Sequence, residues 1–236
     1  MAQDKTSSDR GNDWSVDIVE FSVVLVVNPN DPSILNPDFL RYNRIVDDSH
    51  QVQGDTIVTP AFSQVIFEGG LTVKALPDRV IFEQTGDALT PEGIVCPEMA
   101  KRYVETVPHA QYRAIGINPK AIRILSDASQ EKVLCALSDK GSWTSFKDVM
   151  PQIQLKAIYQ YNNRSIILDI VEAKKREEDG NESPGLLFQV NIHRDIPQTN
   201  PHKRIESLAP ILNSWKEDLD DFRALVGKFN PQRFSS

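Results

Sequence analysis

The stretch CPEMAKRYVETVPHAQYRAIGINPKAIRIL, residues 96–125, decides the fold of this chain. Apolar residues recur at helical spacing over residues 97–107, and Pro108 ends the pattern, so a helix is expected there. A strand is expected directly afterwards, over residues 111–117, until Asn118-Pro119 breaks it. A helix followed at once by a strand in mid-chain indicates a boundary between two units of similar order.

The first unit is expected to contain a strand, a short helix and a three-stranded meander. Residues 16–27 become apolar on both faces in their second half, which is typical of a central strand. Asn36 before Pro37 predicts an N-cap and a first-turn proline for a helix that ends at Tyr42. Turn signals then separate three antiparallel strands, expected at residues 61–68, 71–76 and 80–84.

The second unit is expected to repeat this order. After its first strand, Asp127 with Gln130 resembles a capping box and predicts a helix that Gly141 closes. A turn at Asn162-Asn163 and a polar loop over residues 174–185 then separate three strands, expected at residues 152–161, 165–173 and 186–192. One long helix is expected to complete the chain.

The final helix carries one narrow apolar stripe that repeats at alternating steps of three and four residues: Ile205, Leu208, Leu212, Trp215, Leu219, Phe222, Val226 and Phe229. A coiled coil is one interpretation of this stripe. We favour the other, a helix lying across the chain's own sheet, because no second segment of the chain matches the stripe. Ser207 as the N-cap would place Pro210 in the first turn, where proline costs no helical hydrogen bond.

Short sequence matches accompany the repeated order of elements. Asn28-Pro29 recurs as Asn118-Pro119, and Ile34-Leu35 recurs as Ile124-Leu125, each at an offset of 90 residues. The matching residue pairs and the shared element order together favour an internal duplication.

The expected fold class is α+β, with two similar β-α-β-β-β-α halves related by a pseudo-twofold axis and antiparallel sheets with helices packed on one face. A disordered tail is expected over residues 1–13, the first half over residues 14–108 and the second half, with the long helix, over residues 109–236. In element order alone this layout resembles the saddle of TATA-binding proteins, and no function is carried over from that resemblance.

The composition is that of an ordinary soluble protein, with 40% hydrophobic residues, 25% charged residues and a net charge of −7. Its apolar runs are too short to span a membrane, and its polar N-terminus lacks the apolar segment of a signal peptide. A cytoplasmic location is therefore expected. Cys96 and Cys135 lack metal or redox spacing and are expected to be small buried hydrophobes.

The sequence contains no local motif for catalysis, phosphate binding or metal binding, so no cofactor is expected and a non-enzymatic role is favoured. An enzyme with a dispersed active site is an alternative. Its most specific form pairs Cys96 with His109, because a cysteine at a helix N-terminus can have a lowered pKa.

A second alternative is a nucleic-acid-binding component of a complex. Lys174-Lys175-Arg176 and His202-Lys203-Arg204 could lie near each other at the ends of one hairpin arm. The net charge of −7 and the neighbouring acidic residues argue against this, since phosphate neutralisation needs a basic face.

The favoured function is therefore macromolecular binding or assembly, with a protein partner or a second copy of the chain. Residues 61–67 carry few charges and are expected to form an edge strand that a partner could extend. The polar sides of the meander strands supply the candidate binding residues, which are Gln64, Lys74, Gln154, Lys156 and Gln189.

Overall fold

A computed structural model of the chain describes residues 16–126, 128–130, 133–134, 153–176, 180–197 and 201–231. The expected tail at residues 1–13 and most of the expected helix between Asp127 and Gly141 lie outside these residues.

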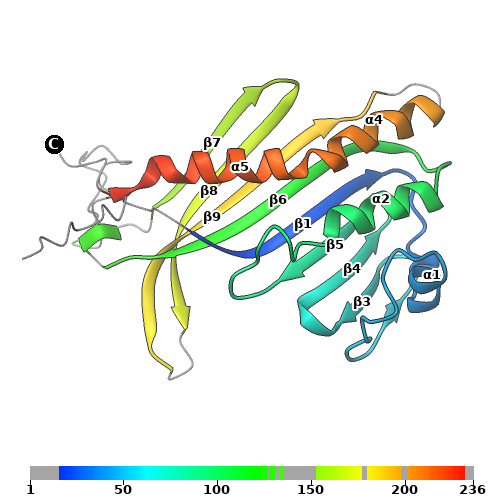
Figure 1. The fold of residues 1–236 in the computed structure, drawn as a ribbon, viewed down its shortest axis with the longest axis horizontal. Helices are drawn as coiled ribbons and strands as arrows, with labels where there is room; N and C mark the ends of the chain where they lie inside the picture. Colours follow the sequence, from blue (N-terminus) through cyan, green and yellow to red (C-terminus); the bar gives the residue numbers. More distant parts are fainter. Residues whose placement is uncertain are drawn as a thin grey trace, which may run out of the picture.

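Nine strands of the described residues form one antiparallel sheet (Figure 1). In chain order they are β1 (Asp17–Val27), β2 (Ile57–Val58), β3 (Ser63–Phe67), β4 (Leu71–Leu76), β5 (Arg79–Thr85), β6 (Tyr112–Ile124), β7 (Gln154–Tyr161), β8 (Arg164–Arg176) and β9 (Glu182–Asp195). The main helices are α1 (Pro37–Tyr42), α2 (Cys96–Thr106), α4 (Pro201–Asn213) and α5 (Trp215–Val226). Across the sheet the strands run β2-β3-β4-β5-β1-β6-β9-β8-β7.

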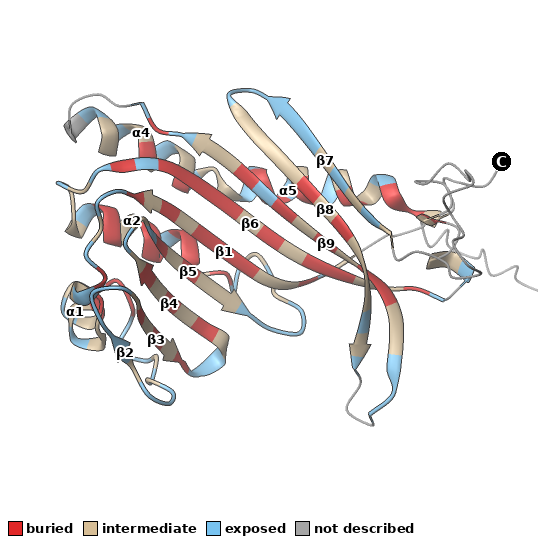
Figure 2. Cartoon of the chain, turned by 180° about the vertical axis from the view of Figure 1, so that it is seen from behind, coloured by how far each residue is buried: buried red, intermediate tan, exposed pale blue. Residues whose placement is uncertain are grey.

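The described helices lie on one face of this sheet, and none of them covers the other face, as Figures 1 and 2 show from opposite sides. Aromatic pairs join the two layers along the sheet. Their ring centroids are 5.4 Å apart for Phe21 and Trp215, 5.7 Å for Phe82 and Tyr103, and 5.9 Å for Phe188 and Phe229. Because buried aromatic side chains dominate core energetics, this interface is the hydrophobic core.

The strand predicted to be central is central, because β1 pairs with β5 on one side and with β6 on the other. Phe21, Val23 and Leu25 point to the helices and are fully buried. Val24 and Val26 point to the uncovered face, where they are only partly buried. The apolar residues on both faces of β1 therefore reflect its position between two paired strands. They do not indicate that helices pack on both faces of the sheet.

Asn118-Pro119 does not end a strand, so the expected break there is wrong. β6 continues through both residues to Ile124, and Pro119 pairs with Phe21 of β1. The pairing of β6 with β9 skips Asn118 and Pro119, since proline has no N–H to donate on that side. Asn28-Pro29, in contrast, lies beyond the end of β1.

The two Asn-Pro pairs thus occupy different structural positions, and the offset of 90 residues does not mark equivalent sites. The two expected sheets are one continuous sheet in which β1 and β6 meet at the centre. Duplication is not shown by this arrangement.

The loop expected over residues 174–185 is mostly strand. β8 extends to Arg176 and β9 begins at Glu182, so this hairpin is longer than its hydrophobic pattern indicates. Lys174 and Glu182 form an ion pair at 3.0 Å within this arm. Residues 174–176 and 182–184 contain no large apolar side chain apart from Pro184, so this part of the sequence has no apolar periodicity that would predict a strand.

The final helix is two helices with a break at Ser214. Its stripe packs on the chain's own sheet, as we favoured, with Leu208, Leu219 and Phe222 buried. The prediction for Pro210 is wrong: α4 begins at Pro201, so Ser207 is not its N-cap and Pro210 lies inside the helix. Proline there removes one helical hydrogen bond, a local cost that burial of the stripe offsets.

Trp215 is partly buried, and its ring makes a T-shaped contact with the ring of Phe21. We expect Trp215→Ala to lower the free energy of unfolding by about 2–3 kcal/mol, less than the roughly 3–5 kcal/mol of a fully buried tryptophan. Urea unfolding of both proteins measures the difference. An unchanged unfolding curve, together with dissociation of an oligomer, would show instead that this helix is an interface between chains.

Among the described helices, none combines the length and the apolar composition needed to cross a membrane.

Candidate binding face

The uncovered face is built from alternate residues of the strands, and their register fixes which side chains share it. In β1 these are Glu20, Ser22, Val24 and Val26, because their neighbours Phe21, Val23 and Leu25 are buried under the helices. Residues directly opposite in antiparallel strands point to the same side, so the register extends this assignment to every strand of the sheet. We call this side of the sheet the uncovered face (Figure 2).

All five candidate residues lie on the uncovered face, in two separate groups. Gln64 of β3 lies directly opposite Lys74 of β4. Gln154 and Lys156 of β7 lie with Gln189 of β9 on the same face, toward the opposite edge of the sheet. Because β5, β1 and β6 lie between the groups, a ligand that touched both would have to span the face.

Asp169 of β8 is the residue around which the second group is organised. Its carboxylate accepts hydrogen bonds from Lys156 Nζ at 3.1 Å and from Gln154 Nε2 at 3.4 Å. Gln189 lies directly opposite it on β9. Sequence reasoning missed Asp169 because its partners are on neighbouring strands, and strand alternation alone does not reveal register.

Two more ion pairs join neighbouring strands on the uncovered face. Lys74 Nζ lies 2.8 Å from Glu83 Oε1, and Lys120 Nζ lies 2.6 Å from Glu20 Oε2. Like the pair at Asp169, each joins a lysine to one carboxylate. These three lysines therefore add no net positive charge to the uncovered face.

A polar hollow of about 240 Å³ opens on the uncovered face where the pairing of β6 with β9 is interrupted. Its polar lining comes from three strands besides β6, and it consists of Glu20, Asn118, Lys120, Asp169, Gln189 and Asn191. Pro119 causes the interruption, since its ring replaces the N–H that β9 would accept. Asn118 and Pro119, which the sequence predicts as a strand break, thus lie within β6 and line a hollow between β6 and β9.

Asn118 supplies an unsatisfied hydrogen-bond acceptor in this hollow. Its Nδ2 donates to Ser22 Oγ at 3.4 Å, while its Oδ1 is buried and has no partner among the described residues. A buried acceptor without a donor costs free energy, and because this oxygen has almost no exposed area, a donor from a ligand would reach it only after the Asn118 side chain moves. The other polar groups that line the hollow, which are carboxylates, a lysine ammonium and side-chain amides, suit it to recognition by hydrogen bonds.

None of the models of known protein families matches this chain, and no curated protein matches its sequence. The assignment of a function to the uncovered face accordingly depends on its geometry and charge.

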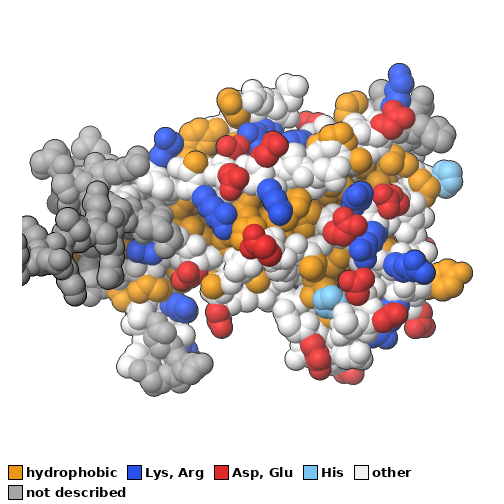
Figure 3. Space-filling model, in the orientation of Figure 1, with side chains coloured by type: hydrophobic (Ala, Val, Ile, Leu, Met, Phe, Trp, Pro, Cys, Tyr) orange, Lys and Arg blue, Asp and Glu red, His pale blue; other side chains and the backbone are white. Residues whose placement is uncertain are grey.

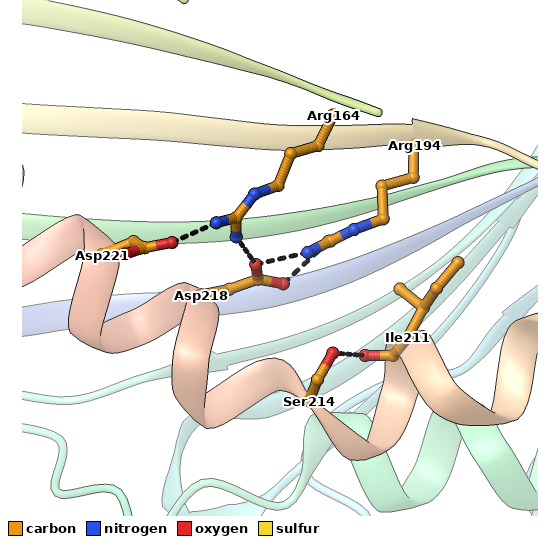
Figure 4. A network of polar contacts seen from close by, with 6 residues as sticks. All are labelled: Arg164, Arg194, Ile211, Ser214, Asp218 and Asp221. Carbon is orange, nitrogen blue, oxygen red and sulfur yellow. Dashed lines mark hydrogen bonds and ion pairs between the residues drawn. The ribbon is translucent and has the colours of Figure 1, made fainter. Parts of the chain in front are cut away.

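A buried network of ion pairs lies on the opposite face of the sheet, under the helices (Figure 4). Asp218 of α5 is completely buried and accepts from Arg164 at 2.5 Å and from Arg194 at 2.6 and 2.8 Å. Arg164 also pairs with Asp221. Burial of Arg164 disfavours its charge, but Asp221 and Asp218 outweigh this and raise its pKa. These ion pairs link α5 to β8 and β9.

Cys96 and His109 do not form a dyad. Cys96 begins α2 and His109 follows its other end, with the whole helix between them. The Cys96 thiol is fully buried and donates toward the Phe21 carbonyl at 3.7 Å. Burial raises the pKa of this thiol, opposite to the lowering considered from its helix position, so it is an inert core residue.

Among the described residues, no group of three or more His, Cys, Asp or Glu side chains could hold a metal ion.

The two basic clusters lie far apart, which contradicts the expectation that they could meet. Residues 174–176 end β8 beside the start of β9, whereas residues 202–204 belong to the first turns of α4, beyond the other end of β9 (Figure 1). At about 3.3 Å per residue the 14 residues of β9 separate them by roughly 45 Å. They cannot form one compact phosphate-binding patch.

The edge expected at residues 61–67 is also occupied. β3 pairs with β2 along Ser63 and Gln64, and Gln53 N donates to Ile66 O at 2.8 Å. A bridge between Val52 and Phe67 covers its end. The long strand at the edge of the sheet is instead β7, with eight residues against two in β2.

Proposed function

We propose that this chain acts by binding another protein on the uncovered face of its sheet. The observation that carries the proposal is that one side of a nine-stranded sheet is packed under helices while the other presents a polar hollow and three charge-neutral ion pairs. Single polar side chains with mixed donors and acceptors match the chemistry of protein surfaces. Apolar side chains such as Val24 and Ile81 beside them add area for contact.

The charge arrangement favours protein over nucleic acid. Nucleic-acid affinity comes largely from lysines and arginines that neutralise phosphates, and Lys74, Lys120 and Lys156 each already face a carboxylate. On the helix side, Figure 3 shows basic and acidic side chains interspersed. Neither observation supports an extended phosphate-binding track.

A duplicated origin and a cytoplasmic location belong to the same proposal. The sheet order supports duplication, since β5-β4-β3 on one side of the central strands corresponds to β9-β8-β7 on the other. A duplicated binding sheet would present two related surfaces, one on each side of β1 and β6.

Charge reversal on the uncovered face should remove the protein partner. We expect the double variant Lys156→Glu and Gln189→Glu to reduce recovery of the partner at least tenfold, because it places two new carboxylates beside Asp169. The matched control is Lys216→Glu, an exposed charge on the helix side. Quantitative mass spectrometry of proteins recovered with each tagged variant, after nuclease treatment, measures the effect.

Equal recovery with the double variant and the wild type would contradict the proposal, as would equal losses with the double variant and with Lys216→Glu. Partners that disappear on nuclease treatment would favour the nucleic-acid alternative. Thermal unfolding of each variant checks that the losses are not caused by unfolding.

A further inference from the structure

Within the part of the chain that the structure describes, no strand pairs with the outer edge of β7. Antiparallel partners alternate between hydrogen-bonded and non-hydrogen-bonded pairs, and the two-residue turn at Asn162-Asn163 makes Tyr161 and Arg164 a bonded pair. Tyr161, Tyr159 and the alternate residues before them therefore bond inward to β8. The N–H and C=O groups of Gln154, Lys156, Ile158 and Gln160 point outward.

The side chains of this edge are unusually apolar for an exposed strand. Ile158 is 60% exposed, Tyr159 42% and Tyr161 56%. Edge strands are ordinarily protected by several charges or by proline, and β7 has only Lys156. Beside the tyrosines lies a hollow of about 590 Å³, walled on its far side by Phe222, Ala224 and Leu225 of α5. An open edge and an apolar recess therefore lie together.

We propose that β7 pairs with β7 of a second copy of the chain in an antiparallel, twofold-symmetric dimer. The register that fits is centred on Ile158, which would face its own counterpart across the axis. Pairing even-numbered residues with even-numbered residues joins only outward-pointing backbone groups, so every bond is made with groups that β8 leaves free.

The side chains in this register are complementary on both faces. On the helix side, Leu155 lies opposite Tyr161 of the second copy and Ala157 lies opposite its Tyr159. On the uncovered face, Lys156 lies opposite Gln160 of the second copy, so no lysine lies opposite another lysine. A register shifted by two residues, centred on Lys156, would place the Lys156 side chains of the two copies directly opposite each other. Repulsion between these like charges disfavours it.

The second copy fits this edge better than an unrelated strand for a further reason. In the proposed register its Leu155 and Ala157 extend the apolar row formed by Tyr161 and Tyr159, beside the hollow under α5. An eight-residue strand pair buries less than the roughly 800 Å² per partner of a standard interface. We therefore expect a dimer with a Kd of about 10–100 μM.

Disulfide trapping tests the register. With Cys135 replaced by serine, Ile158→Cys should give a reducible covalent dimer, because directly opposed residues lie about 5.5 Å apart at Cα, within disulfide range. Lys156→Cys is the matched control, since its two copies would lie roughly 13 Å apart along the strands. Dimer yield under mild oxidation should be at least tenfold higher for Ile158→Cys. A higher yield for Lys156→Cys would overturn the proposal.

Sedimentation of the unmodified chain tests the association itself. We expect concentration-dependent dimer formation that Ile158→Lys weakens at least tenfold by placing two like charges at the axis. Tyr42→Lys, which changes a residue 88% exposed on α1, should leave dimerisation unchanged. A chain that stays monomeric up to about 500 μM, well above the Kd expected for such an area, would overturn the proposal. So would equal dimerisation of the wild type and Ile158→Lys.

Discussion

Replacing Asp218 by alanine is expected to lower the free energy of unfolding by about 3–5 kcal/mol. Its carboxylate is completely buried and accepts hydrogen bonds from both Arg164 and Arg194, whose side chains are only 10% and 15% exposed. Removing it leaves two buried guanidinium groups with one remaining carboxylate, Asp221, near Arg164. Urea unfolding followed by circular dichroism gives the difference directly.

Asp220 provides the matched control, because it lies on the same helix but is 77% exposed and pairs only loosely with Arg223 at 3.7 Å. Asp220→Ala should change stability by no more than about 0.5 kcal/mol, as exposed substitutions do. Similar losses for Asp218→Ala and Asp220→Ala would contradict the buried cluster. Joint replacement of Asp218, Arg164 and Arg194 by apolar residues of similar volume should recover much of the loss, since the cost comes from uncompensated charge.

Replacing Phe21 by alanine is expected to cost about 3–5 kcal/mol. Phe21 is completely buried at the middle of the central strand and contacts Trp215 of α5. Its loss would open a cavity between the sheet and the helices, where the sheet backbone restricts collapse. Denaturant unfolding of the variant and the wild type measures the cost.

Val24→Ala on the same strand compares the two faces of the sheet. Val24 lies on the uncovered face, so its truncation should cost about 1 kcal/mol. A cost for Val24→Ala as large as that for Phe21→Ala would mean that the second face is packed as tightly as the first, which contradicts the two-layer fold.

Elements with a local signal could be predicted from the sequence. Asn36 caps α1, with its Oδ1 accepting from Phe39 N at 2.9 Å, and Pro37 stands at the first helical position. The Asn162-Asn163 turn has positive φ angles of 48° and 59°, as a tight hairpin requires. Cap and turn chemistry depends on neighbouring residues alone, and it is therefore readable without the fold.

Features that depend on the partner strand could not be predicted in this way. Asn118-Pro119 indicates a break locally, yet pairing with β1 keeps it within a long strand. Asp169 and Asp218 each pair with residues on other elements, and the sequence pattern gives no local sign of this pairing. The roles of these polar residues depend on strand register and on burial. The periodicity of a single sequence gives information on neither.

Photocrosslinking in the cells that produce the protein tests the central claim most directly. A photoreactive amino acid placed at Gln189, beside the polar hollow, should yield a covalent adduct with another protein. The same group at Lys216, exposed on the helix side, should give little or none. Equal adduct yields at the two positions, an adduct with nucleic acid at Gln189, or no adduct at Gln189 would contradict protein binding on the uncovered face.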